Sequence, residues 1–240
     1  MTAPAVVPAA LLFDLDGTLA DSFEGIQYAL NAALRDEGFP ERDLEWVKTH
    51  VGRGAPALVL DAVGAGAGEV NARRVGVRFA DRYHASYLER TPVLPGAREA
   101  LELAWVRTCG KVAVISNKYE RFSREWLRHV GLAEFVARVV GPDTFGVRKP
   151  DPGAVLPVLD GFGVAPADAL FVGDMEVDVA AALGVGAPVV GVSPAEGDRE
   201  RLLAAGATAV IAGLGELPAW LAENGRGWRY DGPAARKGRP

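Results

Sequence analysis

Residues 9–22 read AALLFDLDGTLADS, an apolar run that ends in two aspartates with one leucine between them. A short apolar run before a glycine turn is typical of a buried β-strand. Residues two apart in an extended chain point to the same side, so Asp14 and Asp16 can face one site where the strand ends. Gly17 lets the backbone leave in a tight turn. Because open parallel sheets bind ligands at this edge, the stretch predicts an α/β fold with a functional site after its first strand.

Further apolar runs of β-branched character follow, and helix-like sequence separates each from the next. This alternation favours a parallel sheet with helices on both faces. We therefore expect a doubly wound, Rossmann-like α/β core. The six predicted strands lie in residues 9–13, 111–116, 137–141, 169–174, 187–193 and 207–213.

One interval breaks the alternation. Residues 21–91 hold no convincing strand, and their apolar residues recur at helical spacing, as in Phe79, Tyr83 and Tyr87. A small all-helical cap domain, inserted after the first strand, accounts for this pattern. The predicted parts are an α/β core over residues 9–20 and 92–225, a helical cap over residues 21–91, and a flexible tail over residues 226–240.

Composition restricts the partners. The chain of 240 residues has a formal net charge of −5, which argues against nucleic acid and against an anionic membrane as partners. It contains no apolar run of about 18 residues, so no membrane-spanning helix is expected. The first 13 residues lack the basic start of a secretory signal, and the single cysteine, Cys109, cannot form an internal disulfide. We therefore expect a cytoplasmic protein.

Polar residues follow the other predicted strands. Ser116 and Asn117 end one apolar run, and Asp174 ends another, with Asp178 four residues later. Lys149 stands before a proline in the loop after a third run. Taken singly, each could cap a helix or be a solvated surface group. Together with the first stretch they place four acids, a hydroxyl and a cation at one sheet edge, which independent turns would rarely produce.

This set resembles the motifs of the haloacid dehalogenase superfamily, in its phosphoglycolate phosphatase-like branch with a helical C1-type cap. The first motif, Asp-x-Asp-Gly-Thr, stands at residues 14–18, and the Gly-Asp-x-x-x-Asp motif stands at residues 173–178. Ser116 and Lys149 match the hydroxyl and lysine motifs, and the likeness covers about residues 9–223. The resemblance implies a phosphatase with an aspartyl-phosphate intermediate and a magnesium ion. Its expected partner is a small phosphorylated metabolite, and its expected state is a monomer or homodimer.

Charge gives an independent reason for the metal. Four carboxylates against Lys149 leave an excess of three negative charges, which would repel a phosphate dianion. Oxygen ligands suit hydrated Mg²⁺ better than zinc, which prefers His or Cys. By resemblance, Asp16 contributes its backbone carbonyl and Asp178 acts partly through water. The predicted metal ligands are Asp14, Asp16, Asp174 and Asp178.

The two neighbouring acids of the first motif are expected to divide the chemistry. As a hypothesis, Asp14 attacks phosphorus, while Asp16 protonates the leaving alkoxide and then deprotonates the attacking water. By resemblance, dehalogenases and phosphonatases replace the second acid, so Asp16 points to phosphate esters or anhydrides. The groups expected to hold the phosphate are Thr18, Ser116, Asn117 and Lys149, the last of which is also catalytic.

Substrate identity is expected to lie in the cap, because a cap excludes water and contacts the leaving group. Arg53 stands between two glycines in a segment that resembles the cap loop facing the active site of phosphoglycolate phosphatases. It could pair with a carboxylate or a second phosphate of the substrate. It could equally be a solvent-facing arginine between two flexible glycines.

Three other functions stay open. A phosphomutase of the β-phosphoglucomutase kind shares such a core, although no histidine follows the first motif here. A non-catalytic phospho-acceptor such as a receiver domain also clusters aspartates, a hydroxyl and a lysine, but receivers are shorter and carry no cap. A degenerate binding protein on the same fold is disfavoured by the presence of all four motif acids and Lys149.

Overall fold

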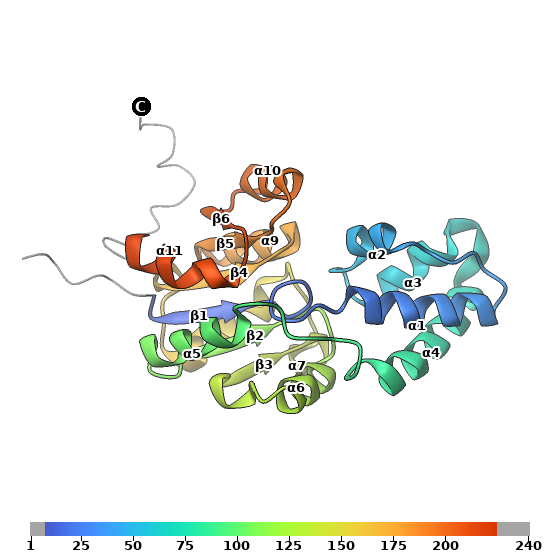
Figure 1. Ribbon diagram of the computed structural model, residues 1–240, viewed down its shortest axis with the longest axis horizontal. Coiled ribbons are helices and arrows are strands. Elements are labelled where there is room, and N and C mark those ends of the chain that lie inside the picture. The colour runs from blue at the N-terminus through green and yellow to red at the C-terminus, as the bar shows by residue number, and fades with distance from the viewer. Residues whose placement is uncertain (1–7, 225–240) are drawn as a thin grey trace, which may run out of the picture. The chain divides into compact units, whose positions relative to one another are not determined.

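A computed structural model describes residues 8–224 of the chain. Within that range six strands form one sheet in the order β3-β2-β1-β4-β5-β6, and every neighbouring pair is parallel (Figure 1). This is a doubly wound order, so the predicted Rossmann-like core is confirmed. The strands are β1 (Ala10–Phe13), β2 (Val112–Ile115), β3 (Arg138–Val140), β4 (Ala169–Gly173), β5 (Val189–Val192) and β6 (Ala209–Ile211).

Each strand lies inside one of the six apolar runs, which confirms the predicted strand positions. The central strands β1, β2 and β4 are buried at every position. Such strands have no polar face because helices cover the sheet on both sides, and this is why their sequences are continuously apolar.

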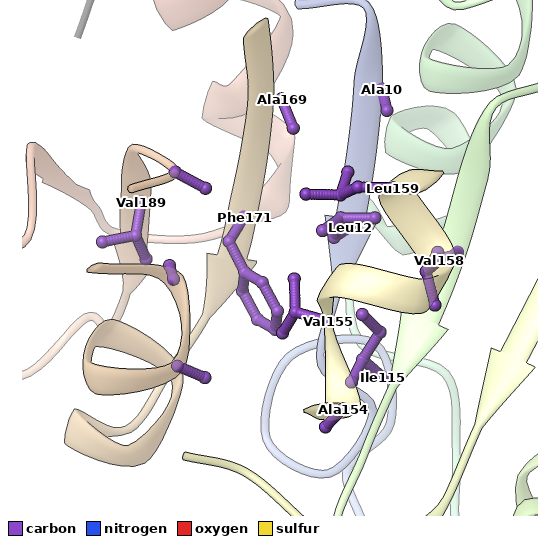
Figure 2. Close-up of a cluster of buried hydrophobic side chains, with 14 of the residues drawn as sticks. Ala10, Leu12, Ile115, Ala154, Val155, Val158, Leu159, Ala169, Phe171 and Val189 are labelled. Carbon is purple, nitrogen blue, oxygen red and sulfur yellow. The ribbon is translucent and has the colours of Figure 1, made fainter. Parts of the chain in front are cut away.

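One of the two core layers is built around Phe171 of β4. Leu12 pairs in register with Ala113 on one side and with Phe171 on the other, so the three side chains share a face of the sheet. Val155 and Leu159 belong to the same buried cluster (Figure 2). Full burial of a side chain as large as phenylalanine stabilises the fold by about 2–3 kcal/mol.

Helices from the second half of the chain cover this face, since residues of α8, α9 and α10 belong to the cluster. The buried residues of α5 are absent from it, and α5 instead contacts β2 and α11, so α5 lies on the opposite face. The remaining helices α6 and α7 contact β3. The bounds are α5 (Ala97–Arg107), α6 (Glu120–His129), α7 (Pro142–Phe145), α8 (Leu156–Phe162), α9 (Glu176–Val185), α10 (Glu196–Ala205) and α11 (Leu217–Asn224).

Residues 20–93 form a second compact unit, and the rest of the described chain forms the first. As predicted, the second unit is helical. The stacked aromatic rings of Phe79, Tyr83 and Tyr87 belong to its buried face, with centroids 5.6 and 5.3 Å apart. Its helices are α1 (Phe23–Asp36), α2 (Leu44–His50), α3 (Ala55–Val63) and α4 (Gly68–Ser86), with a 3₁₀ turn at Ala65–Ala67.

The chain enters and leaves this unit through two segments that lie side by side. Ala20 and Val93 form an antiparallel bridge, and the Asp21 N–H donates to the Pro92 carbonyl at 2.9 Å. A helical unit joined in this way interrupts the α/β core without disturbing its sheet.

The sequence also predicts a flexible tail and the lack of a membrane-spanning helix. The expected flexible tail, residues 226–240, lies outside the described residues. Among residues 8–224, no helix combines the length and the apolar character needed to cross a bilayer.

Candidate active site

The site lies where the sheet topology changes direction. Asp14 directly follows β1 and Asp174 directly follows β4, and these strands are neighbours at the centre of the sheet. Connections from β1 lead to β2 on one side, whereas β4 continues toward β5 on the other. Ligands bind at this switch point in doubly wound folds, because the diverging connections leave a crevice at the carboxyl ends of the strands. The Asp14 N–H donates to the Val172 carbonyl at 2.9 Å, which fixes the end of β1 against β4.

Three carboxylates converge at this point. Oxygens of Asp14, Asp174 and Asp178 all lie within 4.8 Å of one another, a spacing that can hold a metal ion. Asp178 reaches the cluster from the first turn of α9, four residues after Asp174. The structure thus brings together three of the four predicted acids.

Two glycines make room for these acids. A Cβ atom on Gly17 would lie 2.1 Å from Asp174 Oδ2, and one on Gly173 would lie 2.5 Å from Asp178 Oδ2. Gly17 also has a φ of 86°, a conformation that side chains other than glycine rarely adopt. The glycines of both motifs are therefore required by the close approach of backbone and carboxylate.

Lys149 lies between two of the acids. Its Nζ is 2.7 Å from Asp14 Oδ1 and 2.7 Å from Asp178 Oδ1, and the lysine is only 2% exposed. The contact with Asp178 has hydrogen-bonding geometry, and the same ammonium forms an ion pair with Asp14 Oδ1. One buried lysine thus bridges two buried carboxylates.

Burial makes this cluster unfavourable for charge. It raises the pKa of Asp14 from 3.8 to about 7, with smaller contributions from Asp178 and Asp16, although Lys149 opposes the change. Burial and the neighbouring acids Asp14 and Asp178 likewise raise the pKa of Asp174 well above its ordinary value. For Lys149 burial alone would lower the pKa, but the same two carboxylates outweigh it and raise the pKa. The three acids need more positive charge than one lysine supplies.

Thr18 and Asn117, both predicted to bind phosphate, also make contacts inside the site. The Thr18 hydroxyl is fully buried and donates to Asp174 Oδ1 at 2.7 Å, so it orients a metal-ligand candidate. The Asn117 side chain exchanges two hydrogen bonds with the backbone of Lys149, at 2.9 and 3.0 Å. This pair fixes the loop that carries the lysine. Neither contact is visible in the motifs, because the partners lie 156 and 32 residues apart in the sequence.

Ser116 lies at the same sheet edge. It is 5% exposed, and its Oγ accepts from the Lys118 N–H at 3.3 Å. Since a hydroxyl carries both a donor and acceptor sites, this contact leaves its proton free for a ligand. The predicted position beside the acids is consistent with a phosphate contact.

Asp16 lies outside the cluster of three carboxylates. Its Oδ1 instead forms an ion pair with Lys118 Nζ, in which both side chains are mostly buried. Four acids and Lys149 alone would leave an excess of three negative charges, but Lys118 belongs to the same site. With Lys118 included, the excess negative charge falls from three to two. A lysine two residues after the hydroxyl motif is the signal that could have indicated this pairing.

Arg53 belongs to the helical unit and pairs there with Asp61 of α3. The arginine side chain is 62% exposed and Asp61 is 30% exposed. An exposed pair of this kind is weak, since such pairs typically contribute at most about 1 kcal/mol. Arg53 is thus mostly solvent-facing and has a partner within its own unit, and its role toward a substrate stays a prediction.

Comparison with known proteins is consistent with this geometry. A family profile for haloacid dehalogenase-like hydrolases matches residues 8–186. A phosphoglycolate phosphatase of Pseudomonas putida is 38% identical over 196 residues, which cover 79% of this chain and 71% of that protein. A phosphoglycolate phosphatase from Rhodospirillum rubrum is 37% identical over 222 residues, which cover 90% of this chain and 91% of that protein.

A solved structure shares the fold. The crystal structure of a predicted phosphoglycolate phosphatase from Haemophilus somnus superposes with a TM-score of 0.79 at 24% identity, covering 88% of this chain and 97% of that one. The profile match spans the first motif, the inserted helical unit and the last acidic motif. With its clustered acids and buried lysine, the chain belongs to the haloacid dehalogenase-like hydrolase family.

Proposed function

We propose that this enzyme is a Mg²⁺-dependent phosphatase that hydrolyses a small phosphate monoester through an aspartyl-phosphate on Asp14. The observation that carries the proposal is the convergence of Asp14, Asp174 and Asp178 around Lys149 at the switch point of the sheet. The named phosphoglycolate phosphatases that it resembles supply the substrate class. Phosphoglycolate is therefore the first substrate to test, and sugar phosphates are the second.

The residues present fit a magnesium ion. Asp14, Asp174 and Asp178 offer only oxygen ligands, which suit a hard cation. Their charge exceeds that of Lys149 by two, so one dication balances the cluster. When bound, Mg²⁺ would neutralise this excess and withdraw charge from the phosphoryl oxygens.

Asp14 is the nucleophile in this proposal. One of its carboxylate oxygens forms a bond to phosphorus, and the bond between phosphorus and the ester oxygen breaks in line. Lys149, held against Asp14, stabilises the charge of the transferring oxygens. Asn117 keeps the lysine backbone in place for this role. The Ser116 hydroxyl donates to a phosphoryl oxygen.

Asp16 moves the protons. It donates a proton to the departing alkoxide, which leaves as an alcohol, and its carboxylate then accepts a proton from water. The water oxygen bonds to phosphorus, and the bond from phosphorus to Asp14 breaks, which releases inorganic phosphate and restores the Asp14 carboxylate. The Asp16 side chain lies outside the cluster of Asp14, Asp174 and Asp178, so it is not needed as a metal ligand. This supports its assignment to proton transfer.

The helical unit of residues 20–93 acts as the cap in this proposal. Closure over the site excludes water during the first half-reaction and brings cap residues to the leaving group. Arg53 binds the carboxylate of phosphoglycolate by exchanging its contact with Asp61 for a contact with the substrate.

Phosphate release from a substrate panel tests the proposal. The panel contains phosphoglycolate, a hexose phosphate and p-nitrophenyl phosphate, each with Mg²⁺ or with a chelator. We expect release that depends on Mg²⁺ and is abolished in Asp14→Asn, while Asp160→Asn on the exposed surface of α8 keeps wild-type rates. Isomerisation of the hexose phosphate without release would identify a phosphomutase instead. No turnover of any compound would identify a binding protein, and undiminished release by Asp14→Asn would refute the assigned nucleophile.

A further inference from the structure

Lys118 has no role in the chemistry assigned so far, although it lies beside the proton-transfer residue. Its ammonium pairs with Asp16 Oδ1, and the two side chains are only 9% and 13% exposed. Asp16 follows β1 and Lys118 follows β2, so the contact joins neighbouring strand ends that are 102 residues apart in the sequence. A pair buried to this degree holds its geometry better than an exposed surface pair does.

The backbone around Lys118 is held in place by its surroundings. Its N–H donates to Ser116 Oγ, and a Cβ on Gly141 would lie 2.6 Å from its carbonyl oxygen. The next residue but one, Glu120, donates its N–H to Asp143 Oδ1 at 2.8 Å. The loop after β2 is therefore pressed against the turn between β3 and α7, where only glycine fits at position 141. The backbone from which the Lys118 side chain reaches Asp16 is therefore held in place.

We propose that Lys118 is a positioning residue that holds Asp16 as the acceptor of the water proton in the second half-reaction. This inference rests on the proposed function. The ammonium donates to Oδ1 and fixes the carboxylate plane, so Oδ2 is the oxygen left to accept a proton. In that step a water O–H bond breaks toward Asp16, the water oxygen bonds to phosphorus, and the phosphorus–oxygen bond to Asp14 breaks.

The second half-reaction is singled out because of the kind of contact that Lys118 makes. A group that donates a hydrogen bond to a carboxylate orients it as an acceptor, which is what attack by water requires. Loss of this orientation should slow dephosphorylation of Asp14 by about 10-fold to 100-fold, the range that a misplaced catalytic group typically costs. Formation of the aspartyl-phosphate from a substrate whose leaving group needs no proton should be unaffected.

Rapid-mixing kinetics with p-nitrophenyl phosphate and Mg²⁺ separate the two steps, since nitrophenolate departs without a proton. We expect Lys118→Met to release nitrophenolate in a burst approaching one per active site, at the wild-type burst rate, followed by a steady state slowed by about 10-fold to 100-fold. Mass spectrometry of the quenched enzyme should show phosphorylated Asp14. Lys118→Arg should recover most of the steady-state rate because it retains a donor and a positive charge. Lys111→Met, a half-buried lysine at the opposite end of β2, should behave as wild type.

The outcomes separate the two proposals. A wild-type steady-state rate in Lys118→Met overturns the inference. So does a burst that slows in parallel with the steady state, because a merely structural role would impair both steps. Asp16→Asn, which removes the base itself, should accumulate phosphorylated Asp14 to at least the same level. If Asp16→Asn forms no phosphorylated enzyme, the aspartyl-phosphate mechanism fails as well.

Discussion

Replacement of Asp14 by asparagine should stabilise the metal-free protein, and the gain should depend on pH. Burial, followed by the charges of Asp178 and Asp16, raises the pKa of Asp14 from 3.8 to about 7. In the unfolded chain the group has its ordinary pKa, so between these values the native state binds a proton that the unfolded state does not. Stability from this group is therefore fully present below about pH 4 and is lost as the pH rises through about 7.

The size of the effect follows from the shift. A change from 3.8 to about 7 is roughly three pKa units, and each unit is worth about 1.4 kcal/mol, so the wild type loses about 4 kcal/mol across this window. Asparagine is nearly isosteric with the protonated acid and does not titrate. The stability advantage of Asp14→Asn should thus grow by up to about 4 kcal/mol between about pH 4 and pH 8. The charge of Asp14 is also one cause of the raised pKa of Asp174, so Asp14→Asn removes that contribution as well.

Urea unfolding in the presence of a chelator, followed by circular dichroism at several pH values, measures this difference. Asp160→Asn, an exposed carboxylate on α8, is the matched control and should show no such trend. With saturating Mg²⁺ the order should reverse, since a ligand that binds the native state stabilises the chain that retains all three carboxylates. A difference between Asp14→Asn and wild type that stays constant from about pH 4 to pH 8 would refute the reasoning.

Three further predictions probe other parts of the structure. Thr18→Val removes the hydroxyl that donates to Asp174. A Mg²⁺ titration of activity should then show an affinity for the ion about 10-fold lower, with little change in rate at saturation. An unchanged titration would contradict the orienting role of Thr18. Arg53→Ala should raise KM for phosphoglycolate but not for p-nitrophenyl phosphate, while Asp61→Ala, which removes the competing carboxylate, should not raise either. Equal effects of Arg53→Ala on both substrates would remove it from recognition. Phe171→Ala leaves a cavity in the core layer built around that residue and should lower the free energy of unfolding by about 3–5 kcal/mol. A loss below about 1 kcal/mol would show that this layer is not tightly packed.

The sheet and the central acids were predictable from local sequence for a physical reason. Buried parallel strands are continuously apolar, so each run marks a strand, and the topology then brings the residues after each strand to one edge. Asp14 and Asp174 meet because β1 and β4 are neighbours in the sheet. Lys149 instead lies beyond α7 and reaches Asp14 from a loop that the Asn117 side chain holds, which local sequence does not specify.

The partner of each side chain was not predictable in the same way. A motif gives the residue types at a strand end, but it does not say which donor meets which acceptor across 102 or 156 intervening residues. Thr18 contacts Asp174 and Lys118 contacts Asp16 because of the register between neighbouring strand ends, which is set by the packed sheet. The orienting roles of such residues emerge only when the three-dimensional structure places the partners side by side.

The position of Lys149 between Asp14 and Asp178 bears on the order in which the mature enzyme is assembled. An internal counter-ion that is built into the chain lets the cluster of acids form during folding, before any ion from solution arrives. On the proposed function, magnesium would then be loaded and withdrawn as a separate, late event. Preparations stripped of divalent ions should accordingly recover full activity on simple addition of the ion, without passing through a refolding step.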